Sequence, residues 1–343
     1  MTSRTISCRR TRLLADSALV FAGLIWGSSF VVHKFAIGIM PPMFYLGARF
    51  MVACAVLTLV FHRRVLSLTW GQLRASATVG LILFAGFAIQ MGGLVRTSPG
   101  LAGFLSSLYV VLVPLILGLW TGRWPRLGVA AGITLVVCGM GLLMVSGGVA
   151  FGLGEMLTLI ATLFWALHVL AVGRTAPRVD PFALSAVQLG LAGLLAMVWS
   201  LLTEPPMLFP GWMSLGTILY AALTGGVVGY VLMMWAQRHT PPTEAGLLVG
   251  LEAVAALAFA VALGYDTVSP RSILGFAIIL AGTTVSQLSS HGRTGTLSEG
   301  PVAIAPLAQI EEHSLAPAVE DEGLGESPEV AARVSAGLPA DHR

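Results

Sequence analysis

The stretch TEAGLLVGLEAVAALAFAVALG, from Thr243 to Gly264, decides the fold class. Its apolar length, at helical rise, is enough to cross a bilayer core of roughly 30 Å. Glu252 lies near the middle of the stretch, where a charge costs on the order of 3 kcal/mol on insertion scales. The stretch therefore predicts a membrane-spanning helix whose carboxyl group faces a neighbouring helix or a wet cavity and can carry a proton.

An earlier part of the chain repeats this pattern. Residues 96–139 align with residues 239–282 without a gap. The matched pairs include Pro99 with Pro242, Gly132 with Gly275 and Gly139 with Gly282, and at a slightly different offset Trp26 with Trp165 and Arg49 with Gln188. Tyr109 falls on Glu252, so the two halves are similar in frame and different in chemistry.

The composition is that of a polytopic membrane protein. Of the 343 residues, 56% are hydrophobic and 10% are charged, which excludes an ordinary soluble domain. The apolar runs predict ten spans, at residues 17–38, 42–61, 72–92, 100–120, 127–145, 152–172, 182–202, 215–236, 243–264 and 271–287. Because each half has an odd number of helices, the second copy must be inverted. We expect an all-α integral membrane protein of ten transmembrane helices in two inverted five-helix repeats, with a disordered C-terminal tail.

The domain boundaries follow from these runs. We expect a cytoplasmic N-terminus at 1–16, a first five-helix repeat at 17–146, a second at 152–289 and a disordered cytoplasmic tail at 290–343. With the N-terminus inside, the outer connections carry only Lys34, Arg96 and Arg271, while most arginines fall on the cytoplasmic side. This charge bias predicts that both termini are cytoplasmic.

The chain resembles the EamA type of the drug/metabolite transporter superfamily. The resemblance is carried by LIWGSSFVVHKFA (24–36), YLGARF (45–50), SPGLAGFLSSLYVVLVPLI (98–116), GEMLTLIATLFWALHVL (154–170) and TPPTEAGLLVGLEAV (240–254). It implies a multi-pass protein of the bacterial inner membrane that exports or exchanges small organic solutes and is not an enzyme. The family's usual Leu-Glu-Pro reads Leu251, Glu252, Ala253 here, which leaves substrate and coupling open.

Polar and aromatic side chains inside the spans are the candidates for solute binding or coupling. They are Glu252, Arg49, Trp26, Ser29, Trp165, His168, Gln188, Gln90, Tyr109 and Tyr230, with Pro114 as a candidate hinge. Glu252 is either a proton-coupling or substrate-binding carboxylate or a structural group. Arg49 binds a substrate carboxylate, or pairs with a helix C-terminus or with Glu252. Trp26 offers a platform for a cation or ring, or only packs.

The remaining polar residues have structural alternatives as well. A serine on a membrane helix, such as Ser29, more often bonds its own backbone. His168 shares a face with Trp165 and is either a relay or a satisfied core residue. Pro114 has Leu257 as its repeat mate, so we expect a kink in the first half alone.

The most consistent function is a secondary active transporter, an exporter of an amino acid, amine or drug-like solute by alternating access, with proton coupling as an option. The alternatives are a facilitator or exchanger of a carboxylate or sugar derivative, an intramembrane lipid-modifying enzyme using Glu252 and His168, and a membrane sensor acting through its tail. We expect a small solute and the lipid bilayer as partners, with a homodimer left open, and no nucleic acid, cofactor or metal. Cys8, Cys54 and Cys138 support neither a disulfide framework nor a metal site.

Overall fold

The computed structural model describes residues 2–122, 127–145, 152–207, 211–267 and 269–291. These ranges hold helices and turns and no strand, so the all-helical prediction is confirmed for them. They belong to one unit of the chain, Met1–Ser298. The tail expected at 290–343 lies outside the described residues beyond His291.

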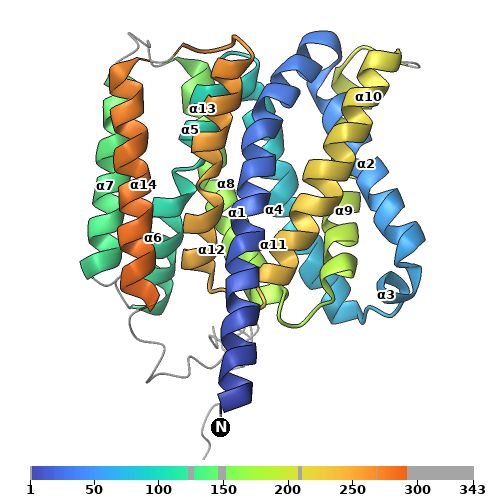
Figure 1. The fold of residues 1–343 in the computed structure, drawn as a ribbon. Coiled ribbons are helices and arrows are strands. Elements are labelled where there is room, and N and C mark those ends of the chain that lie inside the picture. The colour runs from blue at the N-terminus through green and yellow to red at the C-terminus, as the bar shows by residue number, and fades with distance from the viewer. Residues whose placement is uncertain (1, 123–126, 146–151, 208–210, 268, 292–343) are drawn as a thin grey trace, which may run out of the picture. The chain divides into compact units, whose positions relative to one another are not determined.

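The first helix is longer than the sequence indicated. Helix α1 (Thr2–Ile39) begins well before the expected span at Ser17. An ion pair between Arg12 Nε and Asp16 Oδ1, 3.2 Å apart and one helical turn along the chain, supports this extension. In Figure 1 the extension continues below the other helices toward the N-terminus.

The next helices begin where the sequence provides capping residues. Helix α2 (Pro42–Val60) has proline in its first turn, where no backbone N–H is needed. Helix α4 (Trp70–Leu94) begins with a capping box, in which Thr69 and Gln72 each accept a hydrogen bond from the other's backbone N–H. Between them lies α3 (His62–Leu66), a short helix that the sequence did not predict.

Two of the expected spans are each broken into two helices. The first consists of α5 (Pro99–Ser106) and α6 (Tyr109–Thr121), and the second of α12 (Pro242–Val249) and α13 (Glu252–Ala262). The expectation of a one-sided kink at Pro114 concerns another position than these two breaks and stays a prediction. Helix α6 continues through Pro114, and the same break at 250–251 occurs without a proline nearby.

The remaining helices complete the bundle. They are α7 (Leu127–Val145), α8 (Leu153–Thr175), α9 (Pro181–Thr203), α10 (Trp212–Ala221), the π-helix η1 (Ala222–Gly229), α11 (Tyr230–Ala236) and α14 (Pro270–His291). Helices α10, η1 and α11 follow one another without a break and form one continuous rod, seen in Figure 1.

By length and composition, eight helical segments of the described residues are able to cross a membrane, and the protein is a multi-span membrane protein. The eight segments are Arg9–Ile39, Pro42–Val60, Trp70–Leu94, Pro99–Thr121, Leu153–Thr175, Pro181–Thr203, Trp212–Ala236 and Pro242–Ala262. The other two expected spans contain shorter apolar helical runs, Leu127–Gly139 and Ile273–Gly282.

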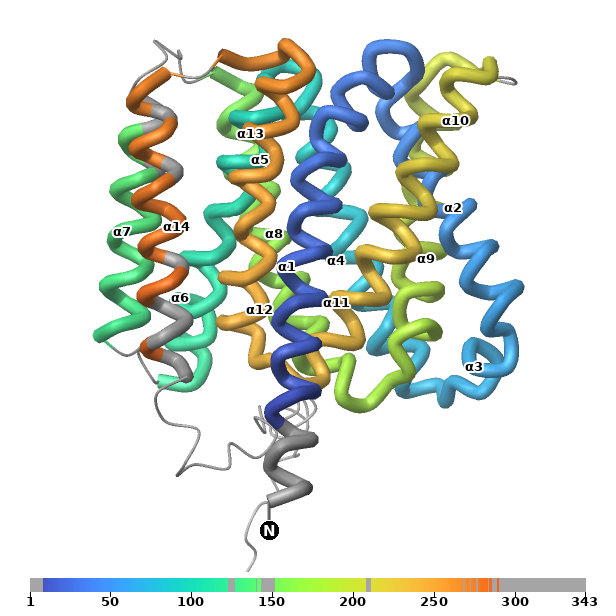
Figure 2. Tube along the Cα trace, in the orientation of Figure 1, coloured from blue at the N-terminus to red at the C-terminus, as the bar shows by residue number. Residues whose placement is uncertain are grey.

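Helices α7 and α14 lie side by side and antiparallel, as Figure 2 shows at one edge of the bundle. A Cβ atom on Gly139 would lie 2.7 Å from the carbonyl oxygen of Gly275, and one on Gly282 would lie 2.7 Å from that of Gly132. Small residues therefore let the two backbones touch, as is common between membrane helices.

Candidate functional site

A partly open cavity lies within the bundle, with room of about 70 Å³ for the centres of water-sized molecules. It is lined by side chains from α1, α2, α4, α5, α6, α8, α11, α12 and α13 and by η1. Nine of the residues singled out from the sequence line it: Trp26, Ser29, Arg49, Gln90, Tyr109, Trp165, His168, Tyr230 and Glu252. Its wall thus combines aromatic rings with one guanidinium and one carboxyl group.

Arg49 on α2 is held by a histidine and by aromatic rings. Its Nη1 donates to His33 Nε2 at 2.7 Å, and His33 Nδ1 lies 2.8 Å from the hydroxyl oxygen of Tyr45. The guanidinium carbon lies 4.5 Å from the ring centroid of Phe50 and 4.6 Å from that of Phe87. Only 3% of Arg49 is exposed, so the side chain is fixed inside the protein.

Arg49 has no carboxylate partner among the described residues. The ion pairs of that part of the chain are Arg12 with Asp16, Arg12 with Glu244, and Arg64 with Asp180. Arg49 Nε and Nη2 are buried there without any hydrogen-bond partner. The expected alternative of a fixed Arg49–Glu252 ion pair is therefore not found.

Glu252 is the first residue of α13, directly after the break in its span. It is 6% exposed and lines the cavity. The N-terminal end of a helix carries partial positive charge, which favours a carboxylate at this position. Its repeat mate Tyr109 is likewise the first residue of α6, and the Tyr109 hydroxyl is buried without a partner in the described part of the protein. Each broken helix therefore presents a polar group to the cavity at the same point.

Trp26 on α1 is joined to the π-helix. Its indole N–H donates to the carbonyl oxygen of Gly225 at 3.1 Å, and its ring lies 5.0 Å from that of Tyr230. Ser29 donates to the carbonyl oxygen of Ile25 one turn earlier, so the expectation that this serine bonds its own helix is confirmed. The interaction of Trp26 with η1 was not predictable from residue types.

The second half has a similar group around His168. His168 Nε2 lies 2.9 Å from Gln188 Oε1. Gln188 is therefore not a lining residue itself but contacts His168, which lines the cavity. Gln188 Nε2 and Trp165 Nε1 are buried without partners among the described residues. Gln90 donates to Ser106 Oγ at 2.6 Å. Several donors around the cavity are therefore left for a ligand or water to satisfy.

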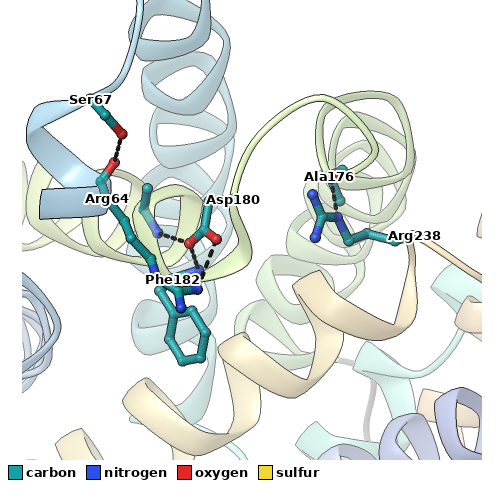
Figure 3. A network of polar contacts seen from close by, with 7 residues as sticks. Arg64, Ser67, Ala176, Asp180, Phe182 and Arg238 are labelled. Carbon is teal, nitrogen blue, oxygen red and sulfur yellow. Dashed lines mark hydrogen bonds and ion pairs between the residues drawn. The ribbon is translucent and has the colours of Figure 1, made fainter. Parts of the chain in front are cut away.

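Charged residues away from the cavity cap helix ends. Lys34 donates to the carbonyl oxygens of Leu94, Val95 and Thr97 at the end of α4, at 2.7, 3.2 and 2.8 Å. At the opposite end of the bundle, Arg64 donates to Asp180, whose carboxylate also accepts from backbone N–H groups at the start of α9 (Figure 3). These contacts hold the loops that connect the spans.

Sequence reasoning did not single out the other eight lining residues, which are Phe30, His33, Phe87, Ser106, Val169, Gly225, Met233 and Val249, nor Tyr45, which contacts His33. One signal was available for His33, since it lies seven residues after Trp26 and so on the same helix face. No group of three or more His, Cys, Asp or Glu side chains within the described ranges is placed to hold a metal.

The many spans and the cavity with its aromatic and polar lining fit a membrane transporter. The chain belongs to the EamA-like transporter family, whose profile matches residues 13–145 and again 152–287. It is 30% identical to an uncharacterized transporter of Archaeoglobus fulgidus over 277 residues, which is 80% of this chain and 86% of that one. It is 26% identical to YedA, an uncharacterized inner membrane transporter of Escherichia coli K12, over 85% of this chain and 95% of that one.

A solved crystal structure has the same fold. It superposes with a TM-score of 0.66 at 20% identity, covering 80% of this chain and 97% of that one. At this identity the likeness bears on the fold alone.

Proposed function

We propose that this protein is a secondary active transporter that exports a small organic metabolite, of the amino acid, amine or drug-like class, by alternating access around the central cavity. The single observation that carries the proposal is this cavity, which is lined by aromatic rings, by Arg49 of the first half and by Glu252 of the second half. The membership in a transporter family supports it.

The proposed architecture is ten spans in two inverted repeats, 17–146 and 152–289. Contacts at matched positions support it, because they occur in reciprocal pairs. Gly139 faces Gly275 as Gly282 faces Gly132, although these residues come from opposite halves. In the same way a Cβ atom on Gly103 would contact Ala256, and one on the repeat mate Gly246 would lie 3.7 Å from Val113, the mate of Ala256. Such reciprocity is what a two-fold axis between the repeats produces, and the antiparallel packing of α7 on its repeat mate α14 favours an axis in the membrane plane.

The two halves differ in the contacts of the matched tryptophans, Trp26 and Trp165. Trp26 packs on Gly229 of the α10–η1–α11 rod, and its mate Trp165 packs on Gly86 of α4. The rod has a π-helix whose Gly225 carbonyl binds Trp26, whereas α4 is a regular α-helix and the Trp165 N–H has no partner in the described residues. Short π-helical segments often mark functional sites. Exchange of these two arrangements between the halves would open the cavity to the other side.

We also propose that both termini are cytoplasmic. The bias of arginine toward the connections on the N-terminal side supports this orientation. Glu252 is the proposed coupling residue, because it is the one carboxyl group that lines the cavity within the described chain. Binding of a proton at Glu252 would then either prevent solute binding or be required for it during transport.

The test is uptake into proteoliposomes, with a panel of labelled amino acids and amines, with and without a proton gradient. Glu252→Gln is compared with Glu204→Gln, since Glu204 accepts hydrogen bonds from the backbone at the start of α2 and lies outside the cavity. We expect gradient-stimulated transport in the wild type and in Glu204→Gln, and transport without stimulation in Glu252→Gln. Stimulation that persists in Glu252→Gln refutes proton coupling at this residue, and a folded protein that moves no solute refutes the transporter.

A further inference from the structure

We propose that the edge of the Arg49 guanidinium formed by Nε and Nη2 is a carboxylate-binding site, and that His33 and Tyr45 are positioning residues that aim it. The solute is then an organic molecule with a carboxylate group. This inference rests on the proposed function, because it assigns the chemistry of the same cavity.

The hydrogen bonds of Arg49 leave one complete edge of the guanidinium unused. Nη1 is taken by His33, whereas Nε and Nη2 have no partner among the described residues. The N–H bonds of Nε and Nη2 run parallel along the side of the guanidinium, at the spacing of the two oxygens of a carboxylate. A carboxylate that binds there makes two charge-assisted hydrogen bonds.

The charge of Arg49 is also unbalanced. The side chain is 97% buried, and no carboxylate of the described chain lies within ion-pair distance. A buried charge without a partner is strongly unfavourable, and pairing is the usual remedy. An anionic ligand supplies both the missing charge and the missing acceptors.

His33 and Tyr45 fix the orientation of the Arg49 guanidinium without neutralising its positive charge. Because the guanidinium remains protonated, His33 must accept at Nε2, so its own proton lies on Nδ1 and is donated to the Tyr45 hydroxyl at 2.8 Å. Phe50 and Phe87 pack against the guanidinium and limit its rotation. A glutamate in place of His33 would hold Arg49 equally well but would remove the net charge that attracts an anion.

The position that matches Arg49 in the second half carries no positive charge, so the anion site lies in the first half alone. Gln188 is the repeat mate of Arg49 and is likewise held by a histidine of the preceding helix, His168. The amide is neutral, so this half offers a hydrogen-bond donor and no charge. The acidic group of the cavity, Glu252, comes from the second half. A carboxylate is therefore bound on the Arg49 side.

The unpartnered nitrogens are covered by neighbouring side chains in this conformation. A carboxylate reaches them when those side chains move aside, so binding selects a conformation other than the one described here. Binding should accordingly stabilise the protein against unfolding.

The experiment compares matched carboxylate and amide probes on the purified full chain in detergent. The pairs are 3-phenylpropionate with 3-phenylpropionamide, phenylalanine with phenylalaninamide, and leucine with leucinamide. Binding is followed by the shift in melting temperature and by tryptophan fluorescence, because Trp26 and Trp165 line the cavity. We expect the carboxylate of at least one pair to bind about 10- to 100-fold more tightly than its amide.

The variants separate recognition from positioning. Arg49→Lys keeps the charge and loses the two-nitrogen edge, so the preference for carboxylate should fall several-fold below that of the wild type. His33→Phe should lose most of the preference, and His33→Gln, whose amide oxygen can still accept from Nη1, should retain most of it. The thermal transition of each variant without probe reports that it is folded. If His33→Phe does not fold, Tyr45→Phe provides a milder loss of the same kind.

Equal binding of acid and amide in every pair, absence of binding by all probes, or an undiminished preference in Arg49→Lys would overturn the proposal. A phosphonate analogue that binds more tightly than 3-phenylpropionate would overturn the assignment to carboxylate. The experiments distinguish failure of the transporter proposal from failure of the carboxylate-site proposal. Selective carboxylate binding without any uptake in proteoliposomes refutes the transporter and leaves the site, whereas uptake of amines that is indifferent to Arg49→Lys refutes the site alone.

Discussion

A single methyl group added at Gly27 should destabilise the protein by forcing α1 away from α13. A Cβ atom at Gly27 would lie 2.5 Å from the Cβ atom of Ala255 and 2.9 Å from the backbone nitrogen of Ala256, and closer still to the carbonyl oxygen of Glu252. Two carbon atoms pack best at about 3.5–4.0 Å, so the helices must separate by roughly 1 Å. The strain falls on the backbone that carries Glu252.

The magnitude follows from two opposing terms. Overpacking in a tight crossing costs about 1–3 kcal/mol, and the upper end applies here because backbone atoms cannot swing aside. Alanine recovers up to about 1 kcal/mol over glycine as a helix former. The net loss is about 2 kcal/mol, which corresponds to a melting temperature lower by about 4–8 °C. Gly38→Ala on the same helix is the control, because a Cβ atom there meets nothing within 4 Å, and it should be neutral or slightly stabilising.

The assay is the melting temperature of purified Gly27→Ala, Gly38→Ala and wild-type protein in one detergent, with uptake measured on the same preparations. Gly27→Ala should be the least stable of the three and should transport poorly, since the added methyl group displaces the start of α13. If Gly27→Ala is as stable as Gly38→Ala, the close crossing of α1 and α13 is wrong, and with it the position given to Glu252.

Three further predictions concern the halves and the ends of the bundle. Trp26→Phe removes the indole hydrogen bond to Gly225 and should destabilise the present conformation by about 1 kcal/mol, whereas Trp165→Phe breaks no hydrogen bond in it. The two variants should therefore shift the accessibility of the cavity, measured by thiol labelling from each side of the membrane, in opposite directions. A shift in the same direction would count against exchange between the halves. Lys34→Met removes three hydrogen bonds from the end of α4 and should lower the melting temperature while leaving the KM of transport unchanged; a changed KM would mean that Lys34 contacts solute. Pro114→Ala should retain transport, because the break in its span lies earlier and occurs in the other half without a proline, and loss of transport would identify Pro114 as a hinge.

The lining of the cavity could largely be predicted from residue types. Polar groups such as Arg49, Gln90 and Glu252 are costly against lipid, so they had to face the interior, and a common interior is where spans from both halves meet. The repeat of Trp26 at Trp165 added the expectation that both halves contribute. These inferences can be drawn without knowing which side chains of different helices are in contact.

The partners of those residues could not be predicted in the same way. That His33 holds Arg49, and that Trp26 binds the Gly225 carbonyl, depends on which helix faces meet across the bundle. The breaks at 107–108 and 250–251 were not predicted from the sequence, which indicated a kink at Pro114 alone; the structure has them at equal repeat positions, in one span with a proline beyond the break and in the other without one. The π-helix has no marker in composition, since glycine and valine also suit a regular membrane helix.

The account's central claim is that one cavity opens alternately to each side of the membrane. Ser29 lines this cavity and is 3% exposed, so Ser29→Cys, made after Cys8, Cys54 and Cys138 are replaced by serine, reports access to it. The most direct measurement is the reaction of Ser29→Cys with a membrane-impermeant thiol reagent in right-side-out and in inside-out vesicles. Alternating access predicts reaction from both sides, slowed from both by a transported solute. Reaction from one side only, under all gradients, would contradict it.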